Sequence, residues 1–162
     1  MDMKAIQAAS IVVARFLLSA IFLAAGVNKI VHWGETEQGL MTVLSNWQSY
    51  LSGFECTQIF FTALLSFTPT LLFFATLMEL GGALLLLLGV KERIGATLLL
   101  LMLIPTTILF HQFWFVDGSE KELQQVMFLK NLAILGGLLL VIIHGAQPPE
   151  KKNNANHSSR FS

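Results

Sequence analysis

One carboxylate lies inside an apolar stretch that is long enough to cross a membrane. Glu79 is at the centre of the 22 residues from Pro69 to Val90, and no other charged residue occurs among them. A carboxylate in hydrocarbon must be buried in protein, paired with a cation or protonated, because an isolated charge loses its hydration there. Such a group can bind a polar head group or relay a proton, so Glu79 is the first candidate for chemistry.

Other polar groups interrupt the neighbouring apolar stretches. Those that we take together as a candidate ligand-binding or buried polar core are Arg15, Lys29, Glu79, His111, Lys130 and Asn131. At about 1.5 Å per helical residue, all of them except Arg15 and Glu79 fall near the same membrane surface and could converge on one pocket. Glu79 falls about midway across the bilayer. Arg15 lies roughly 8 Å further from that surface, within reach of Glu79 for a long side chain.

Two interpretations of these groups remain open. In the functional one, Glu79 and either Lys130 or Lys29 line a pocket, open or gated toward one membrane face, that binds a polar head group or relays protons. In the structural one, Arg15 and Glu79 pair to set the register of two helices. The two lysines then extend their ammonium groups to the membrane surface.

The composition is that of a membrane protein and excludes several classes of function. Hydrophobic residues make up 54% of the chain and charged residues 12%, with a mean hydropathy of +0.67. The net charge is zero, so no basic surface for nucleic acid is expected. The single cysteine, Cys56, excludes a disulfide or a CxxC redox pair within the chain. No HExxH, phosphate-loop or GxSxG motif occurs, so we expect no bound metal or haem and no complete catalytic site.

Four segments are apolar enough to span a bilayer, and their lengths are close to the roughly 20 residues that this requires. They cover about 7–31, 69–90, 94–115 and 123–144. They lack the two-residue alternation of barrel strands, and lipid offers no partners to open backbone groups, so all four should be helices. The sequence therefore predicts an all-α membrane fold, a four-helix bundle forming one domain over 1–146.

Local signals predict where these helices end. Thr68 is suited to cap the second span, with Pro69 at its first helical position, and Gly89 is suited to end it. The second and third spans then form a tight hairpin. Several glycines lie in apolar helices and are expected to allow close packing of helices, namely Gly26, Gly81, Gly82, Gly95, Gly136 and Gly137. Alternatively, Gly81 and Gly82 leave room for a flat ligand beside Glu79.

The connection from about 36 to 67 is too long and too apolar for a plain loop. Its larger apolar residues recur at helical spacing, at Leu40, Leu44, Trp47 and Leu51. This pattern predicts an amphipathic helix at the membrane surface, followed by a second short helix or a continuation into the second span. Residues 147–162 begin near two prolines and are rich in Asn and Ser, which is typical of a disordered tail.

Positive charges indicate an orientation. Lys91 and Arg93, together with basic residues of both termini, fall on one side of the predicted bundle, whereas Lys121 alone falls in the segments on the other side. The positive-inside rule then places both termini in the cytoplasm, so the long 36–67 segment lies on the outer face.

Three segments of the chain resemble the DoxX family of small four-helix membrane proteins. The first has Arg15 and then Phe22–Lys29, and the second has Glu79–Gly82 with Leu88–Val90 and Arg93. The third has Lys130–Ala133 followed by Gly136 and Gly137. The resemblance implies a bundle in the bacterial inner membrane. It also implies kinship with membrane subunits of quinone-linked oxidoreductases and with partners in redox-stress complexes, and it supports the same six polar-core positions.

We therefore expect an accessory that holds a quinone-like or other lipophilic molecule near Glu79 and His111 and works with a separate redox protein. The chain would be at most one subunit of an oxidoreductase. Its surroundings are the lipid bilayer, and a homo-oligomer is compatible with the pattern. One alternative is a membrane scaffold or assembly factor whose buried charges are structural. A less favoured alternative is a transporter of protons or a small solute.

Overall fold

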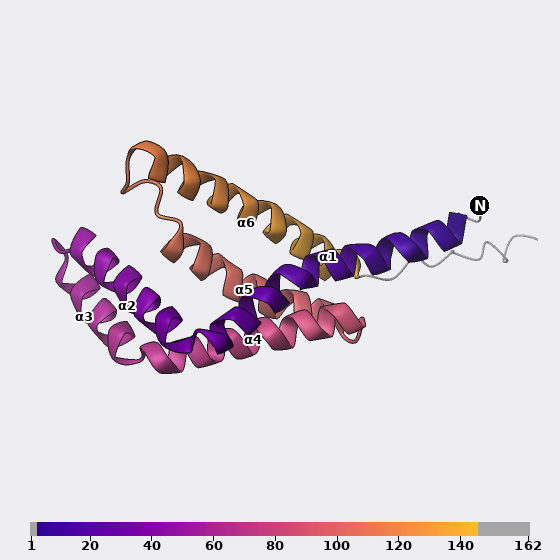
Figure 1. Ribbon diagram of the computed structural model, residues 1–162, viewed down its shortest axis with the longest axis horizontal. Helices are drawn as coiled ribbons and strands as arrows, with labels where there is room; N and C mark the ends of the chain where they lie inside the picture. Colours follow the sequence, from indigo (N-terminus) through magenta and orange to yellow (C-terminus); the bar gives the residue numbers. More distant parts are fainter. Residues whose placement is uncertain (1–2, 146–162) are drawn as a thin grey trace, which may run out of the picture.

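The computed structural model describes residues 3–145, and this part of the chain contains helices and no strand (Figure 1). The helices are α1 (Met3–Val31), α2 (Trp33–Tyr50), α3 (Glu55–Ser66), α4 (Thr68–Leu88), α5 (Glu92–Phe110) and α6 (Gly118–His144). Four of them are long and apolar enough to cross a membrane, namely α1, α4, α5 and α6. The predicted all-α membrane fold is confirmed. The tail predicted for 147–162 lies outside the described residues.

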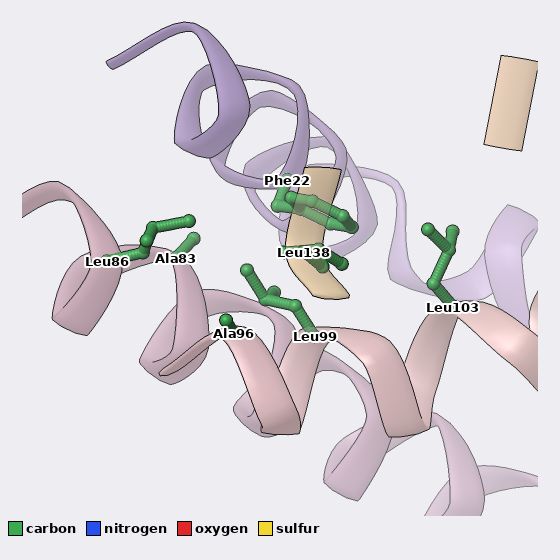
Figure 2. Packing of buried hydrophobic residues seen from close by; sticks show 7 residues of the cluster. All are labelled: Phe22, Ala83, Leu86, Ala96, Leu99, Leu103 and Leu138. Carbon is green, nitrogen blue, oxygen red and sulfur yellow. The ribbon is translucent and has the colours of Figure 1, made fainter. Parts of the chain in front are cut away.

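The four long helices pack in the order α1, α4, α5, α6, with each helix against the next. A core where they meet contains Phe22 of α1, Ala83 and Leu86 of α4, Ala96, Leu99 and Leu103 of α5, and Leu138 of α6 (Figure 2). Despite this shared core, α1 and α6 are not among the closely packed helix pairs. The bundle is therefore closed on the α4 and α5 side and looser between α1 and α6.

The two ends of the bundle differ. At one end, which we call the cap end, α2 and α3 lie side by side (Figure 1). At the other, the hairpin end, a short turn joins α4 to α5, and the first turns of α1 extend beyond that turn (Figure 1). This offset of α1 determines which of its residues lie level with the middle of α4.

The predicted amphipathic helix exists as α2, and its apolar face is turned onto the bundle. Leu44 is only 1% exposed, and the indole Nε1 of Trp47 donates to the carbonyl of Leu109, at the end of α5, over 3.1 Å. Aromatic rings extend this contact, since Tyr50 stacks on Phe115 with 4.1 Å between ring centroids. The short second helix is confirmed as α3, which is separated from α4 by Phe67 alone. Together α2 and α3 cap the bundle.

The helix boundaries correct several expectations. Thr68 is the first residue of α4 and does not cap it. Its hydroxyl donates to the carbonyl of Leu65 over 2.9 Å and so secures the junction with α3. Gly89 ends α4 in the left-handed conformation at φ 69°, as predicted. The third span ends at Phe110 and not near residue 115, and α6 begins at Gly118 because its polar first turns are also helical.

Close packing at glycine is confirmed for part of the predicted set. A Cβ placed on Gly82 would lie 2.9 Å from the carbonyl oxygen of Gly95, and one on Gly95 would lie 2.7 Å from that of Gly82. The backbones of α4 and α5 are therefore in direct contact at these two residues. Gly81 and Gly136 face open space, so packing does not require glycine there.

Candidate functional site

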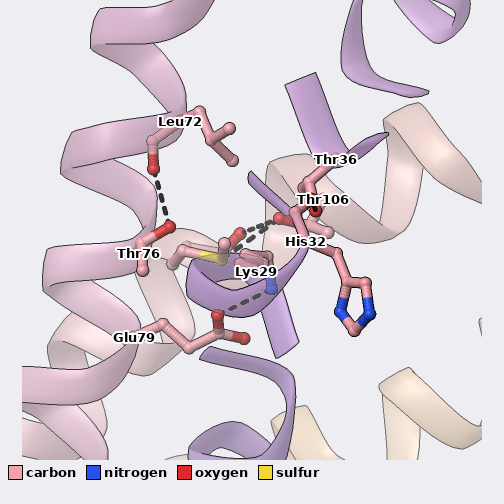
Figure 3. A network of polar contacts seen from close by, with 8 residues as sticks. Lys29, His32, Thr36, Leu72, Thr76, Glu79 and Thr106 are labelled. Atoms are coloured by element: carbon pink, nitrogen blue, oxygen red, sulfur yellow. Dashed lines mark hydrogen bonds and ion pairs between the residues drawn. The ribbon is translucent and has the colours of Figure 1, made fainter. Parts of the chain in front are cut away.

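The buried carboxylate of Glu79 is paired with a lysine. The Nζ of Lys29, near the end of α1, lies 2.7 Å from Oε2 of Glu79, in the middle of α4 (Figure 3). The side chains are 19% and 6% exposed, respectively. The pair forms because the offset of α1 brings its last turns level with the centre of α4.

Neighbouring polar side chains are satisfied by their own helices. The hydroxyl of Thr76, one turn before Glu79, donates to the carbonyl of Leu72 over 2.8 Å. Thr106 of α5 donates to the carbonyl of Met102 over 2.7 Å (Figure 3). Among the described residues, Lys29 is therefore the polar partner of the Glu79 carboxylate. The ammonium of Lys29 still has N–H donors that the carboxylate does not use, so it can also bind a carbonyl oxygen of a ligand.

Arg15 does not pair with Glu79, contrary to the structural interpretation of the sequence. Its Nε donates to the carbonyl of Leu86 over 3.0 Å, and its Nη2 donates to that of Leu87 over 2.7 Å. The last carbonyls of a helix lack partners within it and carry the negative end of the helix dipole, so a guanidinium stabilises them. A Cβ at Gly89 would overlap this guanidinium, which gives Gly89 a second reason to be glycine.

His111 and Asn131 lie between α5 and α6. The Nδ1 of His111, just past the end of α5, is 2.9 Å from Oε1 of Gln124. Asn131 is buried, and its Nδ2 donates to the hydroxyl of Thr107 over 3.0 Å. These contacts hold the two helices together, and neither residue bonds to Lys29 or Glu79.

Lys130 is exposed on a different side of α6 from this contact, about 100° around the helix from Asn131. Its Nζ lies 3.4 Å from the sulfur of Met127, and no acidic partner contacts it among residues 3–145. It lines a groove of about 760 Å³ between α1 and α6, together with Arg15 and a wall that is otherwise mostly apolar. The pocket suggested by the sequence is thus divided. Lys29 and Glu79 come together, whereas Arg15, His111 and Asn131 bind other groups. Among the described residues, Lys130 contacts Met127.

The sequence alone did not identify the partners of these groups. Thr107 and Gln124 carry no distinctive motif, although each lies on a helix at the depth of the residue that it binds. The contact between Arg15 and the end of α4 has one signal in the sequence. Gly89 marks the end of that helix, where the last backbone carbonyls lack partners within the helix. Among the described residues, no group of three or more His, Cys, Asp or Glu side chains is placed to hold a metal ion.

Comparison with known proteins agrees with this architecture. The sequence profile of the DoxX family matches residues 10–112, which is more than half of the chain. The match includes most of α1 and all of α2 to α5, and with them Arg15, Lys29, Glu79 and His111. No curated protein and no solved structure was found to match. With four apolar helices of membrane-spanning length and this match across most of them, the chain belongs to the DoxX family.

Proposed function

We propose that this protein is a membrane subunit or accessory of a quinone-linked oxidoreductase or a redox-stress complex, and that it binds a quinone-like molecule beside Lys29 and Glu79. The observation that carries the proposal is the ion pair itself, at 2.7 Å between two membrane-spanning helices. The resemblance of the sequence to DoxX relatives in such complexes supports the choice of ligand.

A structural role alone is a weak reason to keep such a pair. Removing two charges from water costs free energy that their attraction offsets only in part, and apolar residues of similar volume often stabilise a protein as well. Ionisable groups within membrane helices commonly mark ligand or proton pathways. The pair of Lys29 and Glu79 is therefore better explained as a ligand-binding or proton-transfer site than as a purely structural contact.

The chemistry of the pair suits a quinone. The ammonium of Lys29 can donate a hydrogen bond to a quinone carbonyl oxygen, and the carboxylate of Glu79 can accept a proton. Reduction of a quinone takes up protons together with electrons, so a group that binds the oxygen and exchanges protons is what the membrane subunit would supply. The electrons would come from a cofactor of a partner protein.

The experiment is to purify the protein in a mild detergent and identify bound lipophilic molecules and copurifying proteins by mass spectrometry. A quinone should be recovered with the wild type and lost with Glu79→Gln. The matched control is Glu35→Gln, an exposed carboxylate on α2, which should retain the quinone. Absence of a quinone from the wild type, or full retention by a folded Glu79→Gln variant, would overturn the proposal.

A membrane scaffold is the second candidate, because several embedded polar groups bond to the protein itself. Arg15 binds two backbone carbonyls and Asn131 binds Thr107, which are contacts that hold helices in register. This function predicts a reproducible protein complex without a lipophilic ligand. In that case Glu79→Gln lowers the stability of the complex and leaves its ligand content unchanged.

We also propose that the protein lies in the bacterial inner membrane with both termini and the hairpin end in the cytoplasm. Support comes from Lys91 and Arg93 at the hairpin end and from the acidic residues near the cap end. Cys56 is exposed at the start of α3 and is a native reporter of the cap end. A membrane-impermeant maleimide should label it in intact spheroplasts and should fail to label Cys56→Ser. Labelling of Cys56 only after lysis would show the opposite orientation, with the cap end in the cytoplasm.

A further inference from the structure

The groove between α1 and α6 has the size of a ligand site. Its volume is about 760 Å³, which is within the range of roughly 300 to 1,000 Å³ for small-molecule pockets. Along α6 it runs from Lys130 to Gly145, or roughly 22 Å at 1.5 Å per residue. The small residues Ala133 and Gly137 line it on α6, which we call its floor, and Leu18 of α1 lies 3.7 Å from where a Cβ on Gly137 would be. A long and mostly apolar site of this kind fits a hydrocarbon chain.

A positive charge lies at one end of this groove. The ammonium of Lys130 contacts the sulfur of Met127, one turn nearer the cap end, so the side chain is directed toward that membrane surface. Only a few residues separate Lys130 from Gln124 and Gln125, where the polar first turns of α6 give way to its apolar part. A long lysine side chain that points this way brings its ammonium toward the depth where lipid head groups meet hydrocarbon.

The charges around the groove indicate which kind of molecule would bind in it. Its basic members are Arg15, Lys130 and His144, and no acidic residue from the described part of the chain lines it. Arg15 is already bound to two carbonyls and His144 lies at the far end, so Lys130 is the cation available to a ligand. An anionic group at the mouth of the groove would complete its electrostatics.

A second copy of the chain is a poor occupant. If the same faces met, the two Lys130 ammonium groups would come together and repel each other. Among residues 3–145, the carboxylate in the interior of a span is Glu79, which is buried against Lys29, and the remaining acidic residues lie in α2 and α3 or near the ends of α5 and α6. Within the apolar part of the spans, the described surface of a second copy thus offers no carboxylate to Lys130.

We propose that the groove between α1 and α6 binds an anionic phospholipid from the leaflet at the cap end. Its phosphate lies against the ammonium of Lys130, and one acyl chain follows the groove past Ala133 and Gly137 toward the hairpin end. This site is separate from the Lys29 and Glu79 pair and does not depend on the function proposed for that pair.

The test is native mass spectrometry of the full chain in detergent, titrated with phosphatidylglycerol or with chain-matched phosphatidylcholine. The wild type should bind phosphatidylglycerol about fivefold more tightly, since one lysine near an anionic lipid surface contributes about that factor. Lys130→Gln should bind both lipids equally. The matched control is Lys121→Gln, an exposed cation in the first turns of α6 outside the groove, which should keep the preference.

A second variant tests the acyl chain separately from the charge. Ala133 is exposed on the groove, so Ala133→Phe should fold, keep the charge of Lys130 and lower retention of both lipids by filling the floor. Equal binding of the two lipids by the wild type, or a preference that survives in Lys130→Gln, would overturn the proposal. A third outcome would also overturn it: the wild type is detected with another protein chain bound, and Ala133→Phe loses that chain while its lipid binding is unchanged.

Discussion

Two lysines embedded in this protein have opposite surroundings. Lys29 lies where α1 packs against α4, and its ammonium is paired with a buried carboxylate. Lys130 lies where α1 and α6 stay apart, and its ammonium contacts only the sulfur of Met127 among the described residues. A buried charge must find a partner inside the protein, whereas a charge on an open groove can be neutralised from outside. The contact between α1 and α4 is therefore expected to lose stability when only one of its two charges is removed. The groove between α1 and α6 is expected to keep its stability without its charge and to bind a charged group from outside.

The same contrast appears between adjacent residues of α6. Asn131 faces α5 and is buried against Thr107, whereas Lys130 beside it faces the groove. A helix places successive side chains about 100° apart, so neighbours in sequence serve different surfaces. Substitutions at these positions can test the comparison directly.

The largest effect is expected from Lys29→Met. It leaves the Glu79 carboxylate buried without a cation, and breaking a buried pair in this way costs about 3–5 kcal/mol. The free energy of unfolding, measured by denaturant titration in detergent micelles, should fall accordingly. The double variant Lys29→Met/Glu79→Leu should recover most of the loss, because it leaves no charge unpaired. An unchanged single variant would show that the pair does not hold α1 to α4.

A smaller loss is expected from Gly89→Ala. The new Cβ meets the guanidinium of Arg15, and φ of 69° is strained for alanine, so the variant should lose about 1–3 kcal/mol. The control is Gly81→Ala, at a helical position that faces open space, where stability should rise by about 0.5–1 kcal/mol. Thermal unfolding of the two variants in the same detergent compares them, and equal shifts would contradict the role assigned to Gly89.

Asn131→Ala should cost about 1 kcal/mol, a common value for a hydrogen bond between membrane helices. The hydroxyl of Thr107 keeps its own bond to the carbonyl of Leu103 at 2.6 Å, which limits the damage. A double-mutant cycle with Thr107→Val isolates the contact. A coupling energy near zero would mean that Asn131 is buried for reasons other than this bond.

The smallest effect is expected from Lys130→Gln, which should change the free energy of unfolding by less than about 0.5 kcal/mol in lipid-free detergent. The residue is exposed and has no acidic partner among residues 3–145. Denaturant titration of Lys130→Gln and Lys29→Met under the same conditions compares the contributions of the two lysines to stability directly. A loss as large as that of Lys29→Met would show that Lys130 supports the fold.

The spans could be predicted closely, whereas the pairing of their polar groups could not. Each helix follows from a run of apolar residues, and the end of α4 follows from Gly89. By its distance from the end of its apolar run, Lys29 is expected nearer the membrane surface than Glu79. The structure offsets α1 so that the two are in contact. Such an offset depends on side-chain packing between helices, which apolar runs do not encode.

The candidate site shows the same division. Glu79 stood out because a lone carboxylate in an apolar run needs a partner, and that much is physical necessity. Arg15 also needed a partner, and the nearest unsatisfied groups were backbone carbonyls, which every helix end provides whatever its sequence. A partner that any residue type can supply leaves no trace in the side-chain pattern.

The sequence by itself determined that this chain crosses a membrane as helices, since hydrocarbon forces each backbone amide to bond within its own segment. It also determined which side chains would be expensive to leave in lipid. Only the tertiary structure decided that Lys29 meets Glu79, that Arg15 closes the end of α4, and that Lys130 borders an open groove. These outcomes depend on the tilt, offset and spacing of whole helices, which are set by close packing at a few contacts such as Gly82 against Gly95.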